Sequence, residues 1–200
     1  MENDKIREPQ QKRSIEKKNR IIEVGFQLMC DKGYLKTTTQ DIAKAAGVST
    51  GIIYSYFNNK HDIFLLGLEQ CVHMMFLPIL NNLVDSDIKN LYQNIDSLIS
   101  SLIEIHEVFY KAHNEIESLR YTDPEIASYM YNLEKEITQN VAQHFVKHGY
   151  PEKGLMEKVH VCFNMIESFC HEVAFRPKND FDYEIMRNVV VNTVTQLLEK

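Results

Sequence analysis

The sequence predicts an all-α protein in which a small N-terminal head of three helices precedes a larger helical body. Apolar residues recur at helical spacing along most of the 200 residues. No segment shows sustained alternation of apolar and polar residues, and no Asn-Gly or Asp-Gly pair marks a β-hairpin. Near the N-terminus, a glycine-centred turn at residues 46–49 joins two short amphipathic segments.

The first two helices follow from their end signals. An amphipathic helix is predicted from about Ser14, and Gly33 is its expected C-terminal stop. Thr38 then begins the second helix as N-cap, with Asp41 three residues later in the capping-box position. Gly47 is expected to end this helix and make the turn into the third.

The third helix, about 50–57 and capped by Ser49, differs from an ordinary packing helix. Ile53 and Phe57, four residues apart, give it a single buried edge, while its other positions are mostly small or hydrogen-bonding. Tyr54 and Tyr56 lie about 160° apart around the helix axis, so their phenols are placed to straddle a groove and reach phosphates. We therefore expect a helix-turn-helix whose second helix enters the major groove of DNA; two helices that serve only for packing are the alternative.

The rest of the chain is predicted to be helical to its end. The candidate helices cover residues 60–83, 87–106, 107–121, 124–148, 153–175 and 181–198, separated by polar or Pro-containing breaks. Pro78 is expected to kink the far end of the first of these helices or to cap the next segment. The predicted domains are a flexible basic arm over 1–13, a head over 14–60 that contains the helix-turn-helix, and a helical body over 61–200.

The charge is unevenly distributed. Residues 1–65 hold 11 Lys and Arg against 8 Asp and Glu, a net +3, whereas residues 66–200 hold 11 against 20, a net −9. This balance favours DNA contact confined to the N-terminal third over a protein that coats nucleic acid or an anionic membrane. The four cysteines form no CxxC pair and are expected to be free buried thiols.

The sequence also indicates a soluble, cytoplasmic protein. The N-terminus is too polar for a signal peptide. The most apolar run, from Ile63 to Leu80, is interrupted by Glu69, His73 and Pro78, so we expect no membrane span there.

Several residues of the head carry a family resemblance. They are Gly33-Tyr34, Thr37-Thr38-Thr39, Asp41-Ile42-Ala43, Ala46-Gly47-Val48-Ser49, Gly51, Tyr54, Tyr56-Phe57 and Lys60. In order and spacing they resemble the N-terminal signature of the tetracycline-repressor (TetR) family of transcriptional regulators, over about residues 20–66. The resemblance implies DNA contacts by Thr38, Thr39, Gln40, Ser49, Thr50, Gly51, Ile52, Tyr54, Tyr56 and Lys60. Ile52 departs from the family pattern, which often has Thr there, and this leaves the base preference open between a thymine-methyl contact and simple packing.

For the body, the resemblance implies an effector pocket among the middle helices and a dimer formed by the last two. Dense Met and aromatic residues suit a pocket for apolar or aromatic compounds, although ordinary core packing accounts for most of them. The candidate pocket residues are Met74, His106, Phe109, Tyr110, His113, Met130, Phe163 and Ile166. His106, Tyr110 and His113 belong to a polar stripe that ends at Glu117 and lines either a pocket or a solvated face. The candidate dimer residues are Leu155, Val159, Cys162, Phe169, Val190, Val194 and Leu197.

The sequence predicts no metal site, no cofactor and no enzymatic activity. His160, Cys162, Cys170 and His171 share one helix, but residues 160 and 162 point about 160° apart and 162 and 170 are separated by about 12 Å of helix rise. His144 and His148 are one turn apart at an exposed helix end. No phosphate loop, nucleophile elbow or HExxH motif is present.

These features together predict a ligand-responsive DNA-binding transcriptional regulator. The favoured form is a repressor that binds a palindromic operator as a homodimer and is released by an apolar or aromatic small molecule. Two alternatives stay open: a helical protein-binding module, and an activator or other DNA binder that needs no effector.

Overall fold

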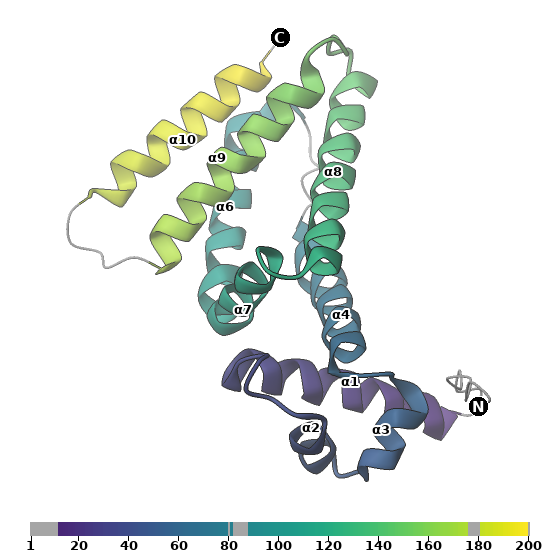
Figure 1. Ribbon diagram of the computed structural model, residues 1–200. Coiled ribbons are helices and arrows are strands. Elements are labelled where there is room, and N and C mark those ends of the chain that lie inside the picture. The colour runs from purple at the N-terminus through teal and green to yellow at the C-terminus, as the bar shows by residue number, and fades with distance from the viewer. Residues whose placement is uncertain (1–11, 80, 82–87, 176–180, 200) are drawn as a thin grey trace. The chain divides into compact units, whose positions relative to one another are not determined.

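The computed structural model describes residues 12–79, 81, 88–175 and 181–199. Every regular element in these residues is a helix (Figure 1), which confirms the predicted all-α class. The predicted basic arm, 1–13, lies outside the described residues except for Lys12 and Arg13, which begin the first helix.

The helices follow the predicted order closely. They are α1 (Lys12–Lys32), α2 (Thr39–Ala46), α3 (Thr50–Tyr56), α4 (Lys60–Cys71), the π-helix η1 (Val72–Phe76), the 3₁₀-helix η2 (Ile88–Asn90), α6 (Leu91–Val108), α7 (Tyr110–Arg120), α8 (Pro124–Lys147), α9 (Leu155–Phe175) and α10 (Tyr183–Leu198). The predicted end signals are also present, since Gly33 follows α1 with a φ of 97° and its N–H donates to the Met29 carbonyl at 2.9 Å.

The long helix predicted from Lys60 changes its winding before Pro78. α4 ends at Cys71, and the next turn, η1, is π-helical. Pro78 has no N–H to donate to the Met74 carbonyl, and its ring crowds that turn, so the backbone there cannot continue as a regular α-helix. The change of backbone in the described residues before Pro78 is thus this π-helical turn, and a kink at Pro78 itself stays a prediction. Residues 80 and 82–87 of the predicted helix lie outside the described residues.

The chain divides into two compact units. Unit 1 contains Met1–Met74 and Lys111–Ile126, and unit 2 contains Met75–Tyr110 and Ala127–Lys200. These units do not follow the predicted boundary at 60/61, because α4 packs along α1 and α7 joins the same unit. In unit 1 the Tyr34 N–H donates to the Glu115 carboxylate of α7 at 2.7 Å, and Lys111 Nζ donates to Asp31 of α1 at 2.8 Å.

Two glycines allow α1 and α4 to approach closely in unit 1. A β-carbon on Gly67 would lie 2.4 Å from Cβ of Phe26, and one on Gly25 would lie 2.7 Å from Cγ2 of Ile63. Phe26 and Phe64 pack with ring centroids 5.2 Å apart, and Ile63 and Phe64 are fully buried. This contact joins the helix-turn-helix to α4.

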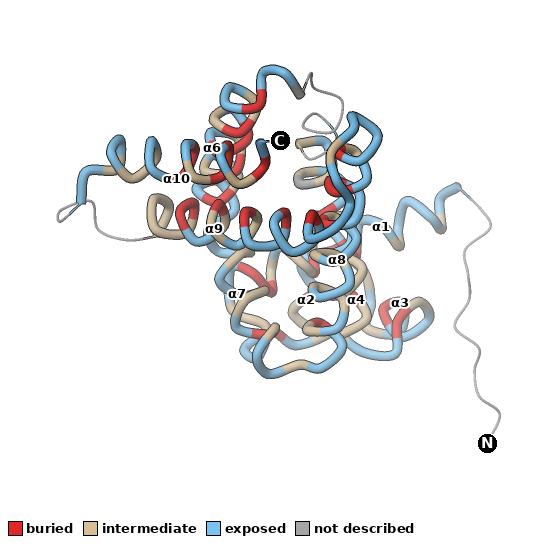
Figure 2. Tube along the Cα trace, turned by 90° about the horizontal axis from the view of Figure 1, so that it is seen from above, coloured by how far each residue is buried: buried red, intermediate tan, exposed pale blue. Residues whose placement is uncertain are grey.

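Unit 2 is built on the packing of α6, α9 and α10. Buried positions recur along one side of α6 and α9 while the other side is exposed (Figure 2). Ile99, Cys170 and Val191 are fully buried in this core. At its edge, Arg187 of α10 donates through Nε to the Asp96 carboxylate of α6 at 2.6 Å and through Nη2 to the Asp96 carbonyl at 2.8 Å, so a directed hydrogen-bond pair supplements the apolar contact.

All four cysteines are free and buried, as predicted. Burial raises the pKa of the Cys30 and Cys170 thiols to about 12 and that of the Cys71 and Cys162 thiols to about 11. Thiols with such pKa values stay protonated at neutral pH and are poor nucleophiles.

One helical run, Lys60–Ile79, is long and apolar enough to cross a bilayer by length and composition alone. Its Ile63, Phe64 and Leu68 side chains are buried in unit 1. About a third of this segment, 35%, is buried, and the core helix of a protein meets the same criteria as a membrane span, so length and composition alone are weak evidence for one.

We expect Gly67→Ala to destabilise unit 1 by about 1–3 kcal/mol, because the new methyl group overlaps the Phe26 side chain. Urea unfolding followed by circular dichroism measures this change. Gly51→Ala is the control: its nearest atom is Ser49 Oγ at 3.9 Å, so the change is expected to stabilise the chain by about 0.4–1 kcal/mol. Equal effects of both substitutions would contradict the close approach of α1 and α4.

Candidate functional site

The helix-turn-helix begins with a complete capping box, as predicted. The Asp41 N–H donates to the Thr38 hydroxyl at 3.1 Å, and the Thr38 N–H donates to the Asp41 carboxylate at 3.0 Å. Lys32 of α1 also donates to this carboxylate at 2.8 Å. The hydrogen bonds from Lys32 and Thr38 hold the pKa of Asp41 well below its ordinary value, so the cap keeps its charge at neutral pH.

The turn between α2 and α3 uses the left-handed conformation of Gly47, with φ 71°. The Gly47 N–H donates to the Lys44 carbonyl at 3.3 Å and the Val48 N–H to the Ala43 carbonyl at 2.9 Å, which closes the end of α2. Ser49 is the N-cap residue of α3, as predicted, but its hydroxyl makes no capping hydrogen bond. This exposed hydroxyl is therefore placed to interact outside the helix.

Helix α3 has one buried side and one open side. Ile53 and Phe57 are 0% and 1% exposed, which confirms the predicted buried edge. Gly51, Tyr54 and Ser55 are exposed. Because Gly51 has no atom nearer than 3.9 Å to the position of a β-carbon, the backbone of α3 is open to close approach by another molecule.

Two hydrogen bonds orient the tyrosines of α3. The Tyr54 hydroxyl lies 3.0 Å from the Thr39 hydroxyl of α2, and the Tyr56 hydroxyl lies 2.6 Å from the Ser14 hydroxyl of α1. The two phenols thus point toward different helices, as their angular separation predicts. Ser14 was not among the predicted site residues, since its spacing from Tyr56 in the sequence gives no signal of the contact.

Lys60 has a structural role that its sequence position did not indicate. Its Nζ donates to the carbonyls of Tyr34 and Thr37 at 2.5 and 2.8 Å and lies 4.3 Å from the centre of the Tyr34 ring. Burial lowers the pKa of Lys60, and the nearby Glu115 carboxylate opposes this effect. Lys60 therefore fixes the segment before α2, and its contact with a DNA phosphate stays a prediction.

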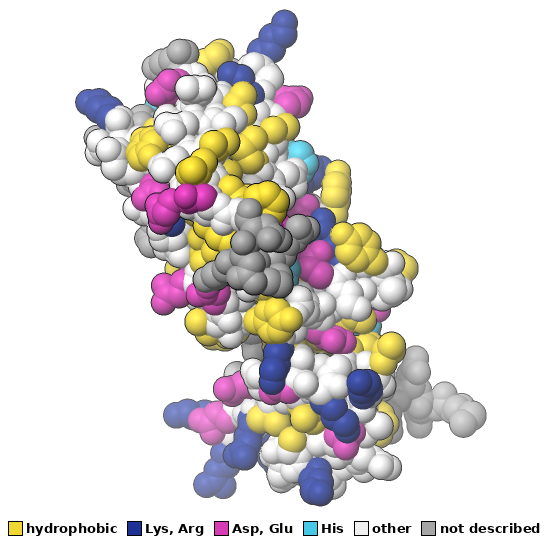
Figure 3. All heavy atoms as spheres, turned by 90° about the vertical axis from the view of Figure 1, so that its left-hand side faces the viewer, with side chains coloured by type: hydrophobic (Ala, Val, Ile, Leu, Met, Phe, Trp, Pro, Cys, Tyr) yellow, Lys and Arg dark blue, Asp and Glu magenta, His cyan; other side chains and the backbone are white. Residues whose placement is uncertain are grey.

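The other predicted DNA contacts lie on the same helices. Gln40 is exposed in the first turn of α2, while Thr50 and Ile52 on α3 are half-buried. Lys and Arg side chains project from unit 1 in the face shown in Figure 3. The exposed cations on α1 and around α2 are Lys12, Arg13, Lys17, Arg20, Lys32, Lys36 and Lys44, of which Lys32 is paired with Asp41. Unit 1 thus combines an open helix with positive charge that suits a phosphate backbone.

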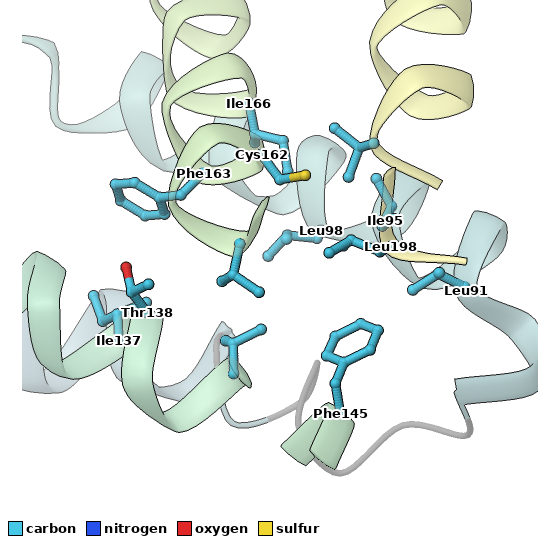
Figure 4. A pocket seen from close by; sticks show the side chains of 13 residues that line it. Leu91, Ile95, Leu98, Ile137, Thr138, Phe145, Cys162, Phe163, Ile166 and Leu198 are labelled. Carbon is cyan, nitrogen blue, oxygen red and sulfur yellow. The ribbon is translucent and has the colours of Figure 1, made fainter. Parts of the chain in front are cut away.

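Unit 2 contains an apolar cavity of about 50 Å³. Side chains from α6, α8, α9 and α10 point into it (Figure 4). The described residues that line it are Leu91, Ile95, Leu98, Ile137, Thr138, Val141, Phe145, Val159, Cys162, Phe163, Ile166, Val194 and Leu198. The Thr138 hydroxyl already donates to the Glu134 carbonyl at 2.8 Å, so the lining offers little polar recognition.

Of the eight predicted pocket residues, only Phe163 and Ile166 line this cavity. Met74 and His113 belong to unit 1, Phe109 and Tyr110 are exposed, Met130 is half-buried, and His106 is buried outside the lining. The predicted polar stripe from His106 to Glu117 does not form on one helix, because α6 ends at Val108 and α7 begins at Tyr110. The prediction selects these residues by type, but the way the helices pack decides which side chains line the same cavity.

The predicted dimer residues need a similar correction. Leu155, Val159, Cys162, Phe169, Val190 and Val194 are buried in the core of unit 2, and Leu197 packs against that core. The first six are thus covered by their own chain, whereas Leu197 is half-buried. The most exposed apolar residues of α9 and α10 are instead Val161, Ile185 and Val189, which are 52%, 61% and 59% exposed.

The comparisons with known proteins agree with the helix-turn-helix geometry. Residues 21–66 match the family model for bacterial regulatory proteins of the tetR family. The chain is a TetR-family transcriptional regulator. A 54-residue segment is 44% identical to the HTH-type transcriptional regulator HbdR of Aromatoleum sp. (strain CIB), over 27% of this chain and 24% of that protein.

A second relative is the biofilm operon icaADBC HTH-type negative transcriptional regulator IcaR of Staphylococcus epidermidis. It is 28% identical over 102 residues, which are 50% of this chain and 54% of IcaR. The chain thus matches about a quarter of HbdR and about half of IcaR.

Solved TetR-family structures share the fold over nearly the whole chain. A protein from Mesorhizobium loti matches with a TM-score of 0.71 and 20% identity, over 94% of this chain and 98% of that one. A regulator from Saccharomonospora viridis, solved in complex with choline, matches with a TM-score of 0.69 and 19% identity. The match covers 90% of this chain and 96% of that one. The predicted architecture is confirmed, with a TetR-type helix-turn-helix followed by a helical body.

We expect Tyr54→Phe to weaken operator binding about 3- to 10-fold, because the change removes a phenolic hydroxyl on the open side of α3 and its bond to Thr39. The operator is first selected from a random DNA pool, and affinity is then measured at fixed salt. Tyr121→Phe, at a tyrosine that is 84% exposed in unit 1 but outside the helix-turn-helix, is the control and should bind normally. Unchanged affinity of Tyr54→Phe would remove Tyr54 from the DNA contacts.

Proposed function

We propose that this TetR-family regulator is a cytoplasmic, homodimeric repressor that binds a palindromic operator and is released by an apolar or aromatic small molecule. The observation that carries the proposal is the cavity in unit 2, whose lining is almost entirely aliphatic and aromatic. Such a cavity recognises a ligand by shape and apolar surface and disfavours a charged one.

The size of the cavity suggests how a ligand would act. A volume of about 50 Å³ holds a few water molecules, so a larger effector would require its lining helices to move apart. A ligand that binds only such an expanded state of unit 2 shifts the population toward it. The chain passes between the two units at 74/75, 110/111 and 126/127, and the last of these points lies within α8. A conformational change in unit 2 can therefore reach unit 1 along the backbone.

The exposed apolar residues of α9 and α10 support a dimer. Ile185 and Val189 are one helical turn apart on α10, and Val161 is exposed on the neighbouring α9. A second copy of the chain that packs these helices against its own would cover all three residues. A dimer also gives two helix-turn-helix elements, and two such elements read the half-sites of a palindrome.

Repression, rather than activation, is proposed from the similarity to a relative. IcaR of Staphylococcus epidermidis is named a negative transcriptional regulator, and it is 28% identical to half of this chain. Because that similarity spans 102 residues, longer than the helix-turn-helix alone, it supports repression for this protein as well.

We expect the double variant Ile185→Glu/Val189→Glu to be monomeric in sedimentation experiments, since two carboxylates would be buried without partners in a dimer. Its operator affinity should fall at least about 100-fold, because one helix-turn-helix makes only half of the contacts. Val146→Glu, at a site that is 39% exposed on α8, is the control and should remain dimeric. A wild-type chain that is monomeric at the concentrations used for operator binding would overturn the dimer proposal.

We expect a screen of apolar small molecules to find ligands that raise the melting temperature and release operator DNA. At 100 times its Kd, such a ligand stabilises the chain by about 2.7 kcal/mol. Leu98→Phe, which adds bulk to the cavity wall, should abolish this effect, whereas Val146→Phe on the surface should not. A ligand that releases DNA equally well from Leu98→Phe would place the effector site elsewhere, and the absence of any such ligand would favour an effector-independent regulator.

A further inference from the structure

We propose that unit 2 contains a binding site for a divalent transition metal of the zinc class, formed by His106 of α6 and by Glu167 and His171 of α9. The sequence predicts no metal site because no single helix carries a suitable ligand set. The packing of α6 against α9 brings two histidines and a carboxylate together from two helices.

The distances among these groups suit a shared metal ion. The Glu167 carboxylate oxygen Oε2 lies 3.4 Å from Nε2 of His106 and 3.6 Å from Nε2 of His171. A ring nitrogen of His106 lies within 4.8 Å of one of His171. In a tetrahedral zinc site with bonds of about 2.0–2.2 Å, neighbouring ligand atoms are about 3.3–3.6 Å apart, so small side-chain rotations suffice to complete the geometry.

A backbone carbonyl orients the ring of His106 as a metal site requires. Its Nδ1 lies 2.7 Å from the Leu102 carbonyl, and because a carbonyl oxygen only accepts hydrogen bonds, Nδ1 carries the hydrogen. In the neutral ring, Nε2 then presents its lone pair toward Glu167. A ring N–H that donates to a backbone carbonyl is the usual support of a metal-ligating histidine.

The surroundings favour coordination. His106 is 1% exposed, while the side chains of Glu167 and His171 are 21% and 36% exposed, so the site is dry on the α6 side and open to ion entry from α9. The Phe175 ring lies 5.9 Å from the ring of His106 and 5.5 Å from that of His171. An apolar ring at this position limits competition by water for the metal.

The ligand set selects the class of metal. Imidazole nitrogens favour zinc and its neighbours cobalt, nickel and copper, whereas Mg²⁺ and Ca²⁺ prefer sites built from oxygen ligands. Two neutral histidines and one carboxylate leave a net charge of +1 on a bound divalent ion. With three protein ligands, the fourth tetrahedral position remains for water or for a donor atom of another molecule.

The test uses the full-length protein, freed of metal with a chelator and titrated with Co²⁺ and then with Zn²⁺ in competition. We expect one Co²⁺ per chain with the visible absorption of a tetrahedral site, and a rise in melting temperature of about 5 °C or more with Zn²⁺ at 100 times its Kd. His171→Gln and Glu167→Gln should each weaken binding more than about tenfold.

Two control variants separate this site from other histidines. His160→Gln changes an exposed histidine on the same helix, and His148→Gln removes the exposed member of the His144–His148 pair, whose rings are 4.4 Å apart. Both should bind Co²⁺ like the unmodified chain. Circular dichroism of each metal-free variant checks that it is folded. The proposal is overturned if the unmodified chain binds no Co²⁺, if folded His171→Gln and Glu167→Gln bind it normally, or if His148→Gln abolishes binding.

Discussion

Helix α3 has only seven residues, too few to be stable alone in water, so its position depends on burial of Ile53 and Phe57 beneath it. That burial gives the helix one fixed side and leaves the other open. The hydrogen bonds of Tyr54 to Thr39 and of Tyr56 to Ser14 then tie its outer side chains to α2 and α1. The predicted DNA-contact surface of α3 thus depends on the contacts that hold a very short helix in place.

The same support extends beyond the helix-turn-helix. α4 approaches α1 closely because Gly25 and Gly67 carry no β-carbon, and Lys60 at the start of α4 holds the carbonyls of Tyr34 and Thr37. α7 begins at Tyr110, 39 residues after α4 ends at Cys71, and its Glu115 returns to unit 1 by accepting a hydrogen bond from the Tyr34 N–H. Unit 1 therefore includes chain segments on both sides of α6, which provides the regulator with more than one covalent route between its units.

Unit 2 separates two chemical environments around α6 and α9. The face of α9 that carries Cys162 and Ile166 lines an apolar cavity, whereas Glu167 and His171 meet His106 of α6 in a polar cluster. The first environment suits a ligand bound by apolar contact, and the second suits a metal ion. Both depend on the packing of α6 against α9, but in opposite ways: a bound metal would stabilise the packed arrangement, whereas a ligand larger than the cavity would favour the expanded one.

The sequence by itself determined the helix order, the capping box at Thr38 and Asp41, the turn at Gly47 and the buried edge of α3, because these depend on residues within a few positions of one another. It could not determine which apolar residues of α9 and α10 face inward, nor that His106 meets Glu167 and His171. A helix shows its apolar stripe in the sequence but not the partner that covers it. Only the tertiary structure, which brings residues far apart in the chain within a few ångströms, decided the division into units, the cavity lining and the polar cluster.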